Sequence, residues 1–366
     1  MTELDAARRT IDEVDAEMAR LFCERMRAVE AVAAYKKERG LPVLDASREE
    51  AVVAKNRARL PDAEADRLGD LYEDFLRHNM ALSRALQKRL LARDAVAYQG
   101  VEGAFAHLAL RRLYPHARAV AFATWRDAVE AVSDGRVEAA VLPFENSNAG
   151  DVSAVLDLCY AHEELYVSRV FDLPVSQNLL GVPGATLADV KTVVSHPQAL
   201  AQCAKFLRML GAETSEYPNT AVAAKHVHDT GDRSLAAIAS PETAELYGLV
   251  VLAPDIAETS DNTTRFIVVT REQPQKGGRF SLLFTVEHAA GMLARVIRII
   301  GEFGFNMESI KSRPKPGVPF EYYFYVELVG RTDSDGARAL LKELGGVCDT
   351  VRVLGVYSRS AKEERE

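Results

Sequence analysis

The segment AAVLPFENSNAG, residues 139–150, decides the fold class of this chain. Its first four residues form an apolar run of strand length, and a dense run of polar and small residues follows before an amphipathic stretch with Val152 and Leu156. Open α/β sheets place their ligands at the carboxyl ends of strands. A helix cap formed by Asn146 and Ser147 would explain one side chain but not the whole run. The segment therefore predicts a strand of an α/β domain that ends in a candidate binding loop.

The same pattern continues on both sides of this segment. Between residues 94 and 272, short Val- and Ala-rich runs alternate with amphipathic helices and Gly or Pro turns, which is typical of α/β domains. The predicted strands are residues 95–98, 139–142, 192–195, 235–239 and 264–270.

Three more polar clusters stand next to predicted strands. GVEG at residues 100–103 opens a helix and could present backbone amides to an anion, although a plain turn is the more common meaning. SHPQALAQC at residues 195–203 follows a strand, and NTTRF at residues 262–266 enters one. Cys203 lies on an apolar helical face, which favours a place in the core over a nucleophile paired with His196.

The N-terminal part of the chain is helical. Residues 5–39 contain neither Gly nor Pro, and apolar residues recur at helical spacing. At about 1.5 Å per residue this helix is roughly 50 Å long, so it needs an equally long packing partner, such as a second copy of itself. Gly40 and Pro42 end it, and two further helices are predicted at residues 47–60 and 65–93.

Three cations lie on the apolar face of the first helix: Arg8, Arg25 and Lys36. Burying a charge is costly unless it is paired. A single Arg would be explained by a side chain that reaches past its neighbours to water. Three in register favour an anionic ligand inside a helical bundle.

The C-terminal segment has the order strand, helix, strand, strand, helix, strand, which is the ferredoxin-like pattern. It follows a polar linker at residues 272–278. The predicted elements are strands at 280–287, near 310, at 322–328 and at 351–357, and helices at 292–303 and 335–344.

Composition limits the function further. With 366 residues, 48% of them hydrophobic and 27% charged, the chain should fold into two or three globular domains. A net charge of −8 argues against nucleic-acid binding, and the chain has no signal-peptide pattern and no apolar run long enough for a membrane span. Its four cysteines form no CxxC pair, which favours neither a zinc site nor disulfides. We therefore expect a soluble cytoplasmic protein.

Residues 1–93 resemble the small helical chorismate mutases of the intertwined-dimer type. The resemblance implies an all-α pocket for the carboxylates and ether oxygen of chorismate, lined by Arg8 from a second copy, Arg25, Lys36, Asp45, Arg48 and Glu49. A pericyclic rearrangement needs only a compact substrate conformer and charge at the breaking C–O bond, and Lys36 and Arg25 are our candidates for that charge.

The third helix departs from that family. Its usual pair is Ser followed one turn later by Gln or Glu, whereas this chain offers Asn79 and Ser83. Ser83 is too short to replace a Gln at the ether oxygen. The mutase is then either less active or completed by Arg84 or Gln87.

The four polar clusters of residues 94–272, in this order and spacing, resemble prephenate dehydratase. The resemblance implies two α/β lobes with the site in the cleft, similar to periplasmic solute-binding proteins. Thr264 occupies the position of the catalytic threonine, where its hydroxyl would hydrogen-bond the departing ring hydroxyl while decarboxylation drives aromatisation. Arg265 is either the partner of a substrate carboxylate or part of a structural ion pair.

The loop residues Glu145, Asn146 and Ser147 are expected to orient the substrate, with Glu145 as the proton source if its pKa is raised in the cleft. Gly103 and Thr220 are further candidates for substrate binding. The first cluster lacks two hydroxyl residues that are usual in the family, because Ala104 and Ala106 occupy those positions. Water or His107 would have to supply the missing hydrogen bonds.

Residues 278–358 resemble the ACT domains that bind phenylalanine across a dimer interface in these dehydratases. The resemblance assigns the ligand to two short motifs, Gly291, Met292, Leu293 and Ala294 in the first, and Ser312, Arg313 and Pro314 in the second. Gly291 lets backbone amides approach a carboxylate, although simple closure of the fold also explains it. Lys311 stands where the family has Glu, which reverses the charge at the start of the second motif.

Together these resemblances imply a bifunctional enzyme of phenylalanine biosynthesis that converts chorismate to prephenate and then prephenate to phenylpyruvate, with feedback by phenylalanine. We expect a homodimer or higher homo-oligomer, neither metal nor organic cofactor, and no nucleic-acid or membrane partner. One alternative is a monofunctional prephenate or arogenate dehydratase whose helical module serves dimerisation or regulation. The other is a non-enzymatic small-molecule sensor.

Overall fold

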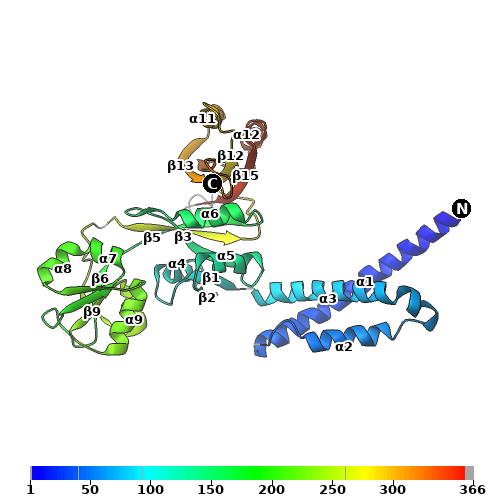
Figure 1. Cartoon of the computed structure of the whole chain (residues 1–366), viewed down its shortest axis with the longest axis horizontal. Coiled ribbons are helices and arrows are strands. Elements are labelled where there is room, and N and C mark those ends of the chain that lie inside the picture. Colours follow the sequence, from blue (N-terminus) through cyan, green and yellow to red (C-terminus); the bar gives the residue numbers. More distant parts are fainter. Residues whose placement is uncertain (1, 40, 93, 260, 359–366) are drawn as a thin grey trace. The chain divides into compact units, whose positions relative to one another are not determined.

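The computed structural model describes residues 2–39, 41–92, 94–259 and 261–358 (Figure 1). The chain divides into two compact units, Met1–Arg93 and Asp94–Glu366.

The first unit is helical, as predicted. It consists of α1 Glu3–Arg39, α2 Ala46–Arg57 and α3 Asp62–Ala92. The side chain of Asp45 caps α2 by accepting a hydrogen bond from the backbone N–H of Arg48. Arg57 and Arg77 connect α2 to α3 through salt bridges to Glu73 and Glu50.

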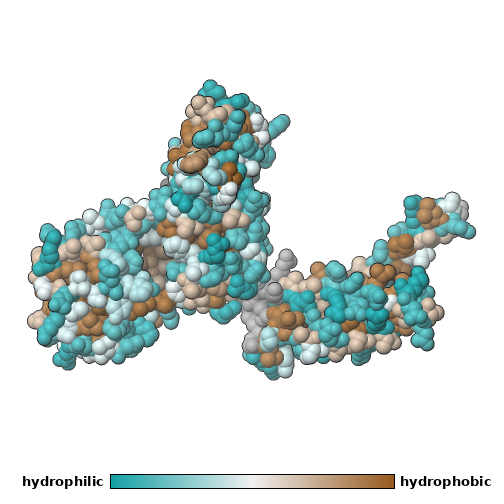
Figure 2. Space-filling view, in the orientation of Figure 1, coloured by the Kyte–Doolittle hydropathy of each residue, from teal (hydrophilic) through white to brown (hydrophobic). Residues whose placement is uncertain are grey.

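The apolar face of α1 is only partly covered within one chain. Ala33 is buried near its C-terminal end, but Ile11, Met18 and Phe22 are 59%, 44% and 43% exposed. Apolar side chains are visible along the surface of this unit (Figure 2). Exposed apolar side chains in such a row are uncommon on the surface of a monomeric protein.

The second unit contains two α/β lobes and a C-terminal module (Figure 1). The first lobe contains β1 Ala95–Gln99, α4 Phe105–Leu113, β2 Arg118–Phe122, α5 Trp125–Ser133, β3 Ala139–Asn146, β4 Gly150–Asp151, α6 Ser153–Ala161, β5 Tyr166–Pro174 and β11 Thr263–Thr270. The second lobe contains β6 Asn178–Gly181, β7 Thr192–Ser195, α7 Pro197–Gln202, α8 Ala204–Leu210, β8 Glu213–Glu216, α9 Thr220–Thr230, β9 Leu235–Ala239, α10 Pro241–Tyr247 and β10 Val250–Ala253.

The chain passes from the first lobe into the second after β5 and returns in β11. In the first lobe β1 pairs in parallel with β2 and β3, and β11 lies antiparallel between β3 and β5. In the second lobe β7 pairs in parallel with β8 and β9. This topology confirms the predicted two-lobed α/β fold and brings the carboxyl end of β3 beside the start of β11.

The C-terminal module has the predicted ferredoxin-like order. Its elements are β12 Arg279–Thr285, α11 Met292–Glu302, β13 Asn306–Pro314, β14 Tyr322–Val329, α12 Asp335–Gly345 and β15 Thr350–Tyr357, and its sheet has the order β13-β14-β12-β15. The helices pack on one face of the sheet, where Phe280, Val296 and Leu340 belong to one buried cluster.

The other face of this sheet packs on the first lobe. Leu283, Tyr325 and Tyr357 belong to the same buried cluster as Phe144 and Val167. Arg352 donates hydrogen bonds to the carbonyl oxygens of Cys159, Glu163 and Leu165 at and beyond the end of α6. Cations at this position stabilise the last turn of a helix. The module and the first lobe therefore share one core.

A glycine makes the junction between their sheets possible. β15 pairs in parallel with β5 at Gly355 and Val167, and a Cβ atom at position 355 would lie 2.7 Å from the Cβ of Val167. Real Cβ atoms do not approach so closely, so any side chain here must push the two strands apart.

We expect Gly355→Ala to lower the free energy of unfolding by about 1–3 kcal/mol, because overpacking at a junction buried on both sides cannot relax easily. The matched control is Gly301→Ala in α11, where nothing lies within 4 Å of the added methyl group. That change should stabilise the protein by up to about 1 kcal/mol through helix propensity. Thermal unfolding of both variants checks the pair, and equal melting temperatures would contradict it.

Candidate functional site

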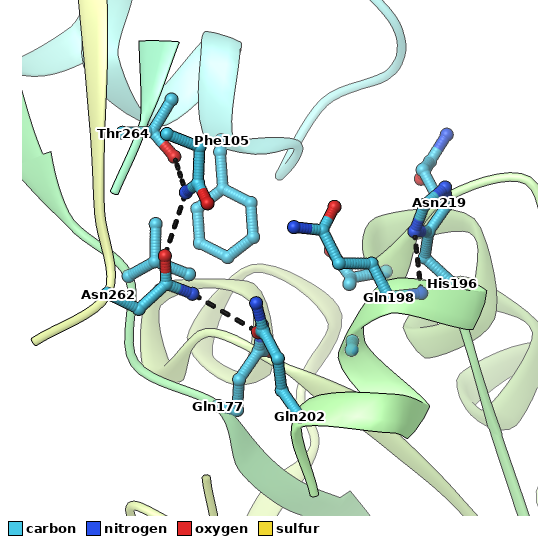
Figure 3. Close-up of a pocket in the computed structure, with 12 residues that line it drawn as sticks. Phe105, Gln177, His196, Gln198, Gln202, Asn219, Asn262 and Thr264 are labelled. Atoms are coloured by element: carbon cyan, nitrogen blue, oxygen red, sulfur yellow. Dashed lines mark hydrogen bonds between the residues drawn. The ribbon is translucent and has the colours of Figure 1, made fainter. Parts of the chain in front are cut away.

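A pocket lies between the two lobes, where the carboxyl ends of their strands face each other (Figure 3). Its volume is about 140 Å³. Polar side chains from both lobes line it together with a few apolar ones: Phe105, Asn146, Val175, Gln177, His196, Gln198, Ala199, Gln202, Asn219, Thr220, Asn262 and Thr264. None of these described lining residues carries a permanent charge.

Asn146 and Thr264 meet at one wall of this pocket. The side-chain carbonyl of Asn146 accepts hydrogen bonds from the backbone N–H groups of Asn148 and Ala149, at 3.1 and 2.9 Å. Because both donors are backbone groups, they fix which end of the Asn146 amide is oxygen. Its Nδ2 atom therefore donates, to Thr264 Oγ1 at 2.9 Å and to Asn262 Oδ1 at 2.7 Å.

From Asn146, hydrogen bonds between side-chain amides continue through Asn262 and Gln202 to Gln177 (Figure 3). Since Asn262 accepts through Oδ1, its Nδ2 atom donates to Gln202 Oε1 at 3.1 Å. Gln177 approaches the same oxygen at 3.2 Å, so it must present Nε2. The carbonyl oxygen of Gln177 is then left as an acceptor; it is buried in the pocket wall and accepts no hydrogen bond from any residue that the structure describes.

This amide chain gives the pocket a defined polarity. At one end Thr264 already accepts a hydrogen bond, so its hydroxyl proton is available to a bound molecule. At the other end Gln177 offers a carbonyl acceptor. Buried acceptors of this kind are costly unless a ligand or water supplies a donor.

Glu145 and Arg265 do not line this pocket. They precede Asn146 and follow Thr264 along their strands, so their side chains point to the other face of the sheet. There Arg265 binds Glu145 at 3.2 Å and Asp172 at 2.9 Å. Of the two interpretations of Arg265 from the sequence, the structural ion pair matches this geometry.

The other predicted residues of the first lobe support the loops around the pocket. Ser147 Oγ donates to the carbonyl of Asp261 and accepts from the N–H of Thr263, both at 3.0 Å. Gly103 has φ +86° and donates its N–H to His107 Nδ1 at 3.2 Å. His107 thus makes one hydrogen bond to the first loop, and burial and the nearby Arg111 lower its pKa.

The second lobe contributes residues from helix N-termini. Thr220, a predicted substrate-binding residue, lines the pocket at the start of α9, and Asn219 caps that helix by accepting from Val222 N at 2.8 Å. Cys203 is fully buried, and burial raises the pKa of its thiol to about 12, as expected of a core residue.

Nine of the twelve residues that line the pocket were not among the predicted site residues: Phe105, Val175, Gln177, His196, Gln198, Ala199, Gln202, Asn219 and Asn262. Gln202 and Asn262 stand inside polar clusters that the sequence analysis identified, so the clusters pointed to the region but not to these side chains. Gln177 lies just after β5, which the sequence analysis did not predict.

The helical unit contains a second groove, of about 380 Å³, lined by Met18, Leu21, Phe22, Arg25, Phe75, His78, Asn79 and Leu82. Arg25 is half-buried and donates to Asn79 Oδ1 at 3.1 Å and to Ser83 Oγ. The structure therefore brings three predicted site residues together: Arg25 and Asn79 line the groove, and Ser83 binds Arg25.

The remaining predicted residues of this unit lie around the α1–α2 connection or on the surface. Lys36 Nζ donates to the carbonyl of Val43 at 2.6 Å, and Glu49 forms an ion pair with Arg84. Arg48 and Arg8 are exposed.

Ser83 and Gln87 are one turn apart on α3, and both are buried, at 5% and 7% exposure. Gln87 Oε1 accepts no hydrogen bond from the described residues. The Ser-then-Gln spacing that the third helix seemed to lack is therefore present one turn later than expected, at Ser83 and Gln87.

The two ligand motifs of the C-terminal module lie on different elements. Gly291, with φ +86°, begins α11, and Met292, Leu293 and Ala294 form its first turn. Ser312, Arg313 and Pro314 end β13, and Arg313 binds Asp157 of α6 at 2.7 Å.

The described residues were also considered as possible membrane spans and metal ligands. No described helix is long and apolar enough to span a membrane. No group of three or more His, Cys, Asp or Glu side chains among the described residues is arranged to hold a metal ion.

Comparison with known families matches three parts of the chain. Residues 96–274 match prephenate dehydratase, residues 7–88 match chorismate mutase type II, and residues 280–346 match the ACT domain.

Individual proteins agree with these matches. A bifunctional chorismate mutase/prephenate dehydratase from Neisseria gonorrhoeae is 31% identical over 362 residues, 96% of this chain and 95% of that protein. Arogenate dehydratase/prephenate dehydratase 2 from Arabidopsis thaliana is 35% identical over 73% of each chain. The crystal structure of prephenate dehydratase in complex with L-Phe from Arthrobacter aurescens has a TM-score of 0.67 at 29% identity and covers 73% of this chain and 91% of that one.

The relative from Neisseria gonorrhoeae matches almost from end to end, through all three modules. The chain therefore belongs to the bifunctional chorismate mutase/prephenate dehydratase family, whose helical and two-lobed domains precede a regulatory ACT domain.

Proposed function

We propose that this enzyme of phenylalanine biosynthesis rearranges chorismate to prephenate in the helical groove and converts prephenate to phenylpyruvate, carbon dioxide and water in the pocket between the lobes. Phenylalanine acts as the feedback ligand of the ACT domain. The main support for the dehydratase site is the chain of hydrogen-bonded amides that ends at the Thr264 hydroxyl.

In the dehydratase pocket, the Thr264 hydroxyl donates a hydrogen bond to the ring oxygen that leaves. Loss of the ring carboxylate as carbon dioxide supplies the electron pair that expels this oxygen and makes the ring aromatic. The Thr264 hydroxyl is too weak an acid to transfer its proton completely, so its role is to stabilise developing charge. Asn146 holds that hydroxyl in place.

Neutral donors hold the substrate carboxylates in this site. Thr220 and Asn219 stand at the N-terminus of α9, where backbone N–H groups and the helix dipole favour anions. Glu145 lies on the opposite face of the sheet from the pocket, so the proton that converts the departing hydroxide to water comes from solvent and not from Glu145.

In the mutase groove, Arg25 binds a carboxylate of chorismate, and Asn79 and Ser83 orient its guanidinium. Gln87 and Lys36 are the donors for the ether oxygen of the breaking bond. A reaction of this type is accelerated by holding the compact conformer and by charge at the ether oxygen. Asp45, Arg48 and Glu49 complete the site at the start of α2.

A second copy of the chain completes the mutase site. It covers the exposed stripe of α1 around Ile11 and Met18 and supplies Arg8, which the single chain leaves exposed. The free edge of β13 is a second place where two copies can pair. The exposed free thiol of Cys23 suits the reducing cytoplasm.

Thr264→Val should lower dehydratase turnover about 100- to 1000-fold, the usual loss when one donor to developing charge is removed. Thr264→Ser should recover much of it because the hydroxyl is kept. The matched control is Thr270→Val at the other end of β11, which should leave turnover unchanged. Phenylpyruvate formation from prephenate measures all three variants. Full activity of Thr264→Val would remove Thr264 from the mechanism.

Arg25→Ala should abolish chorismate turnover and leave prephenate turnover intact, because the two pockets lie in separate compact units. Arg20→Ala is the control: this exposed arginine on the same helix pairs only with Glu17 and Glu24 among the described residues. Following chorismate loss and phenylpyruvate formation in one assay separates the activities. Loss of both in Arg25→Ala would argue against independent sites.

Ile11→Asp should convert the oligomer to a smaller species and remove mutase activity, because a carboxylate on the apolar stripe of α1 cannot be buried unpaired. Ala16→Asp places the same charge on the opposite face of the helix, given roughly 3.6 residues per turn, and should change neither property. Light scattering coupled to size-exclusion chromatography measures the mass. An Ile11→Asp protein of unchanged mass and activity would show that the stripe has another purpose.

A further inference from the structure

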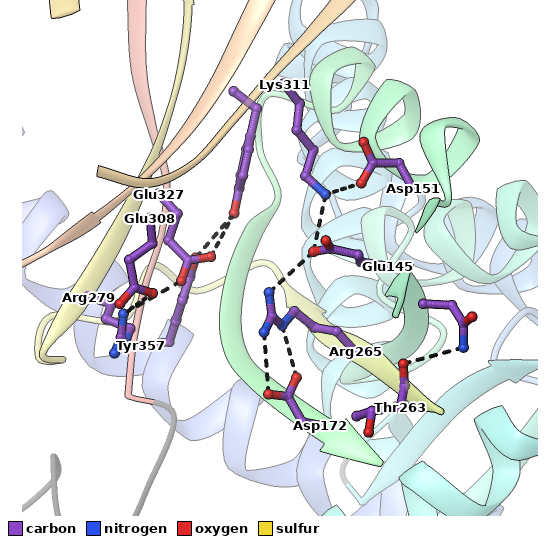
Figure 4. Close-up of polar contacts among 12 residues, drawn as sticks. Glu145, Asp151, Asp172, Thr263, Arg265, Arg279, Glu308, Lys311, Glu327 and Tyr357 are labelled. Atoms are coloured by element: carbon purple, nitrogen blue, oxygen red, sulfur yellow. Dashed lines mark hydrogen bonds and ion pairs between the residues drawn. The ribbon is translucent and has the colours of Figure 1, made fainter. Parts of the chain in front are cut away.

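One lysine of the ACT domain reaches the strands that carry the dehydratase site (Figure 4). Lys311, on β13, extends to the first lobe, where its Nζ atom lies 3.3 Å from Glu145 Oε2 and forms a hydrogen bond with Asp151. The same Nζ lies 4.7 Å from the centre of the Phe144 ring. The side chain is only 9% exposed.

Such a lysine is fixed in place. Taking an ammonium group out of water is costly, and among the described residues the two carboxylates and the aromatic ring compensate for it. A long, flexible side chain at a surface contact would lose little on release, whereas release of this one would take a cation away from Asp151 and leave Glu145 paired with Arg265 alone among the described residues. The contact is therefore more than a loose ion pair between domains.

Glu145 connects Lys311 to β11, the strand that carries Thr264. Its Oε2 atom also binds Arg265 at 3.2 Å, and Arg265 is held on its other side by Asp172 of β5 at 2.9 Å (Figure 4). Glu145 and Arg265 are direct partners in the β3–β11 ladder. The next pair along that ladder is Asn146 and Thr264.

The β3–β11 ladder is irregular at this point. The register between β11 and β3 shifts between Arg265 and Phe266, because Phe144 is an extra residue on β3. A bulge interrupts the regular hydrogen bonds and leaves the strand ends beyond it less constrained. Beyond the bulge, Thr264 still pairs with β5 and Asn146 with β4, and the Lys311–Glu145–Arg265 cluster adds side-chain contacts that connect β3 to β11.

We propose that Lys311 is a positioning residue of the dehydratase reaction, supplied by the regulatory domain, which holds the Asn146–Thr264 pair through Glu145. This inference rests on the proposed dehydratase site. It also gives a route for feedback, because Lys311 directly precedes Ser312 and Arg313 of the second ligand motif. A ligand that moves β13 changes the position of the lysine and hence the geometry at Thr264.

The neighbouring contact of Arg313 has a different effect. Arg313 and the hydroxyl of Tyr323 both bind Asp157 on α6, at 2.7 and 2.6 Å. This contact fastens the ACT domain to a helix and does not touch β3 or β11. In the sheet of the ACT domain, Arg313 and Tyr323 therefore dock the domain on α6, whereas Lys311 positions the strands of the dehydratase site.

The test compares Lys311→Met, Lys311→Arg and the control Lys315→Met. Lys315 is the next lysine along the chain and pairs with Glu321 inside the ACT domain. We expect Lys311→Met to lower the kcat of the dehydratase about tenfold with a smaller change in KM, and Lys311→Arg to recover most of it. Lys315→Met should match the wild type. Mutase turnover of the same samples reports correct folding of the helical unit, and thermal unfolding reports the rest.

A double-mutant cycle with Glu145→Gln separates positioning from simple loss of stability. If Lys311 acts through Glu145, Lys311→Met should have little further effect on kcat in the Glu145→Gln background. Additive effects, or wild-type kcat in Lys311→Met, would overturn the proposal. If Lys311→Met does not fold, Lys311→Gln, which keeps one hydrogen-bond donor, replaces it in the same cycle.

The feedback response gives an independent measurement. Phenylalanine titrations of dehydratase rate should show a weaker response in Lys311→Met than in Lys315→Met, because the route from β13 to the strands is cut. An identical response in both variants would contradict the route. Absence of dehydratase activity in the wild type would instead contradict the proposed function, so the two failures are distinguishable.

Discussion

The return of the chain in β11 is the constraint on which the rest of the second unit depends. After leaving the first lobe, the chain builds the whole second lobe and comes back to pair between β3 and β5. This pairing closes the first lobe, sets the two lobes face to face and places Thr264 opposite Asn146. It also puts Arg265 on the face that the ACT domain covers. A single strand thus has one face toward the pocket and one face toward the ACT domain, with Thr264 and Arg265 one residue apart.

Much of this fold could be predicted from the sequence, because buried strands leave clear apolar runs. β7 and β9 were predicted to the residue, and the order of elements in the ACT domain was predicted in full. β5 was missed although it is central, because Arg169 and Asp172 interrupt its apolar pattern; Asp172 pairs with Arg265. β8 is an exposed edge strand of polar residues, and no pattern distinguishes such a strand from a loop.

The site was predictable to a similar degree. The motifs pointed to Asn146 and Thr264. Which face of the sheet carries the side chains of Glu145 and Arg265 depends on the register between β3 and β11, and a sequence does not show that register. Gln177 enters the pocket from a segment with no motif. In the helical unit, the sequence placed Arg25 on an apolar face and left Arg84 and Gln87 as alternatives on α3. The structure separates these two, because Gln87 is buried beside Ser83 whereas Arg84 pairs with Glu49.

The fixed polarity of the amide chain makes the enzyme sensitive to a change of a single atom. Hydrolysis of the Asn146 amide to a carboxylate would keep the shape of the side chain but remove its only donor. The Thr264 hydroxyl would then turn its proton toward the new carboxylate and away from the substrate, and Asn262 would face an acceptor where it now meets a donor. Slow deamidation of Asn146 would therefore inactivate the dehydratase, while the fold of the domain and the separate helical unit stay intact.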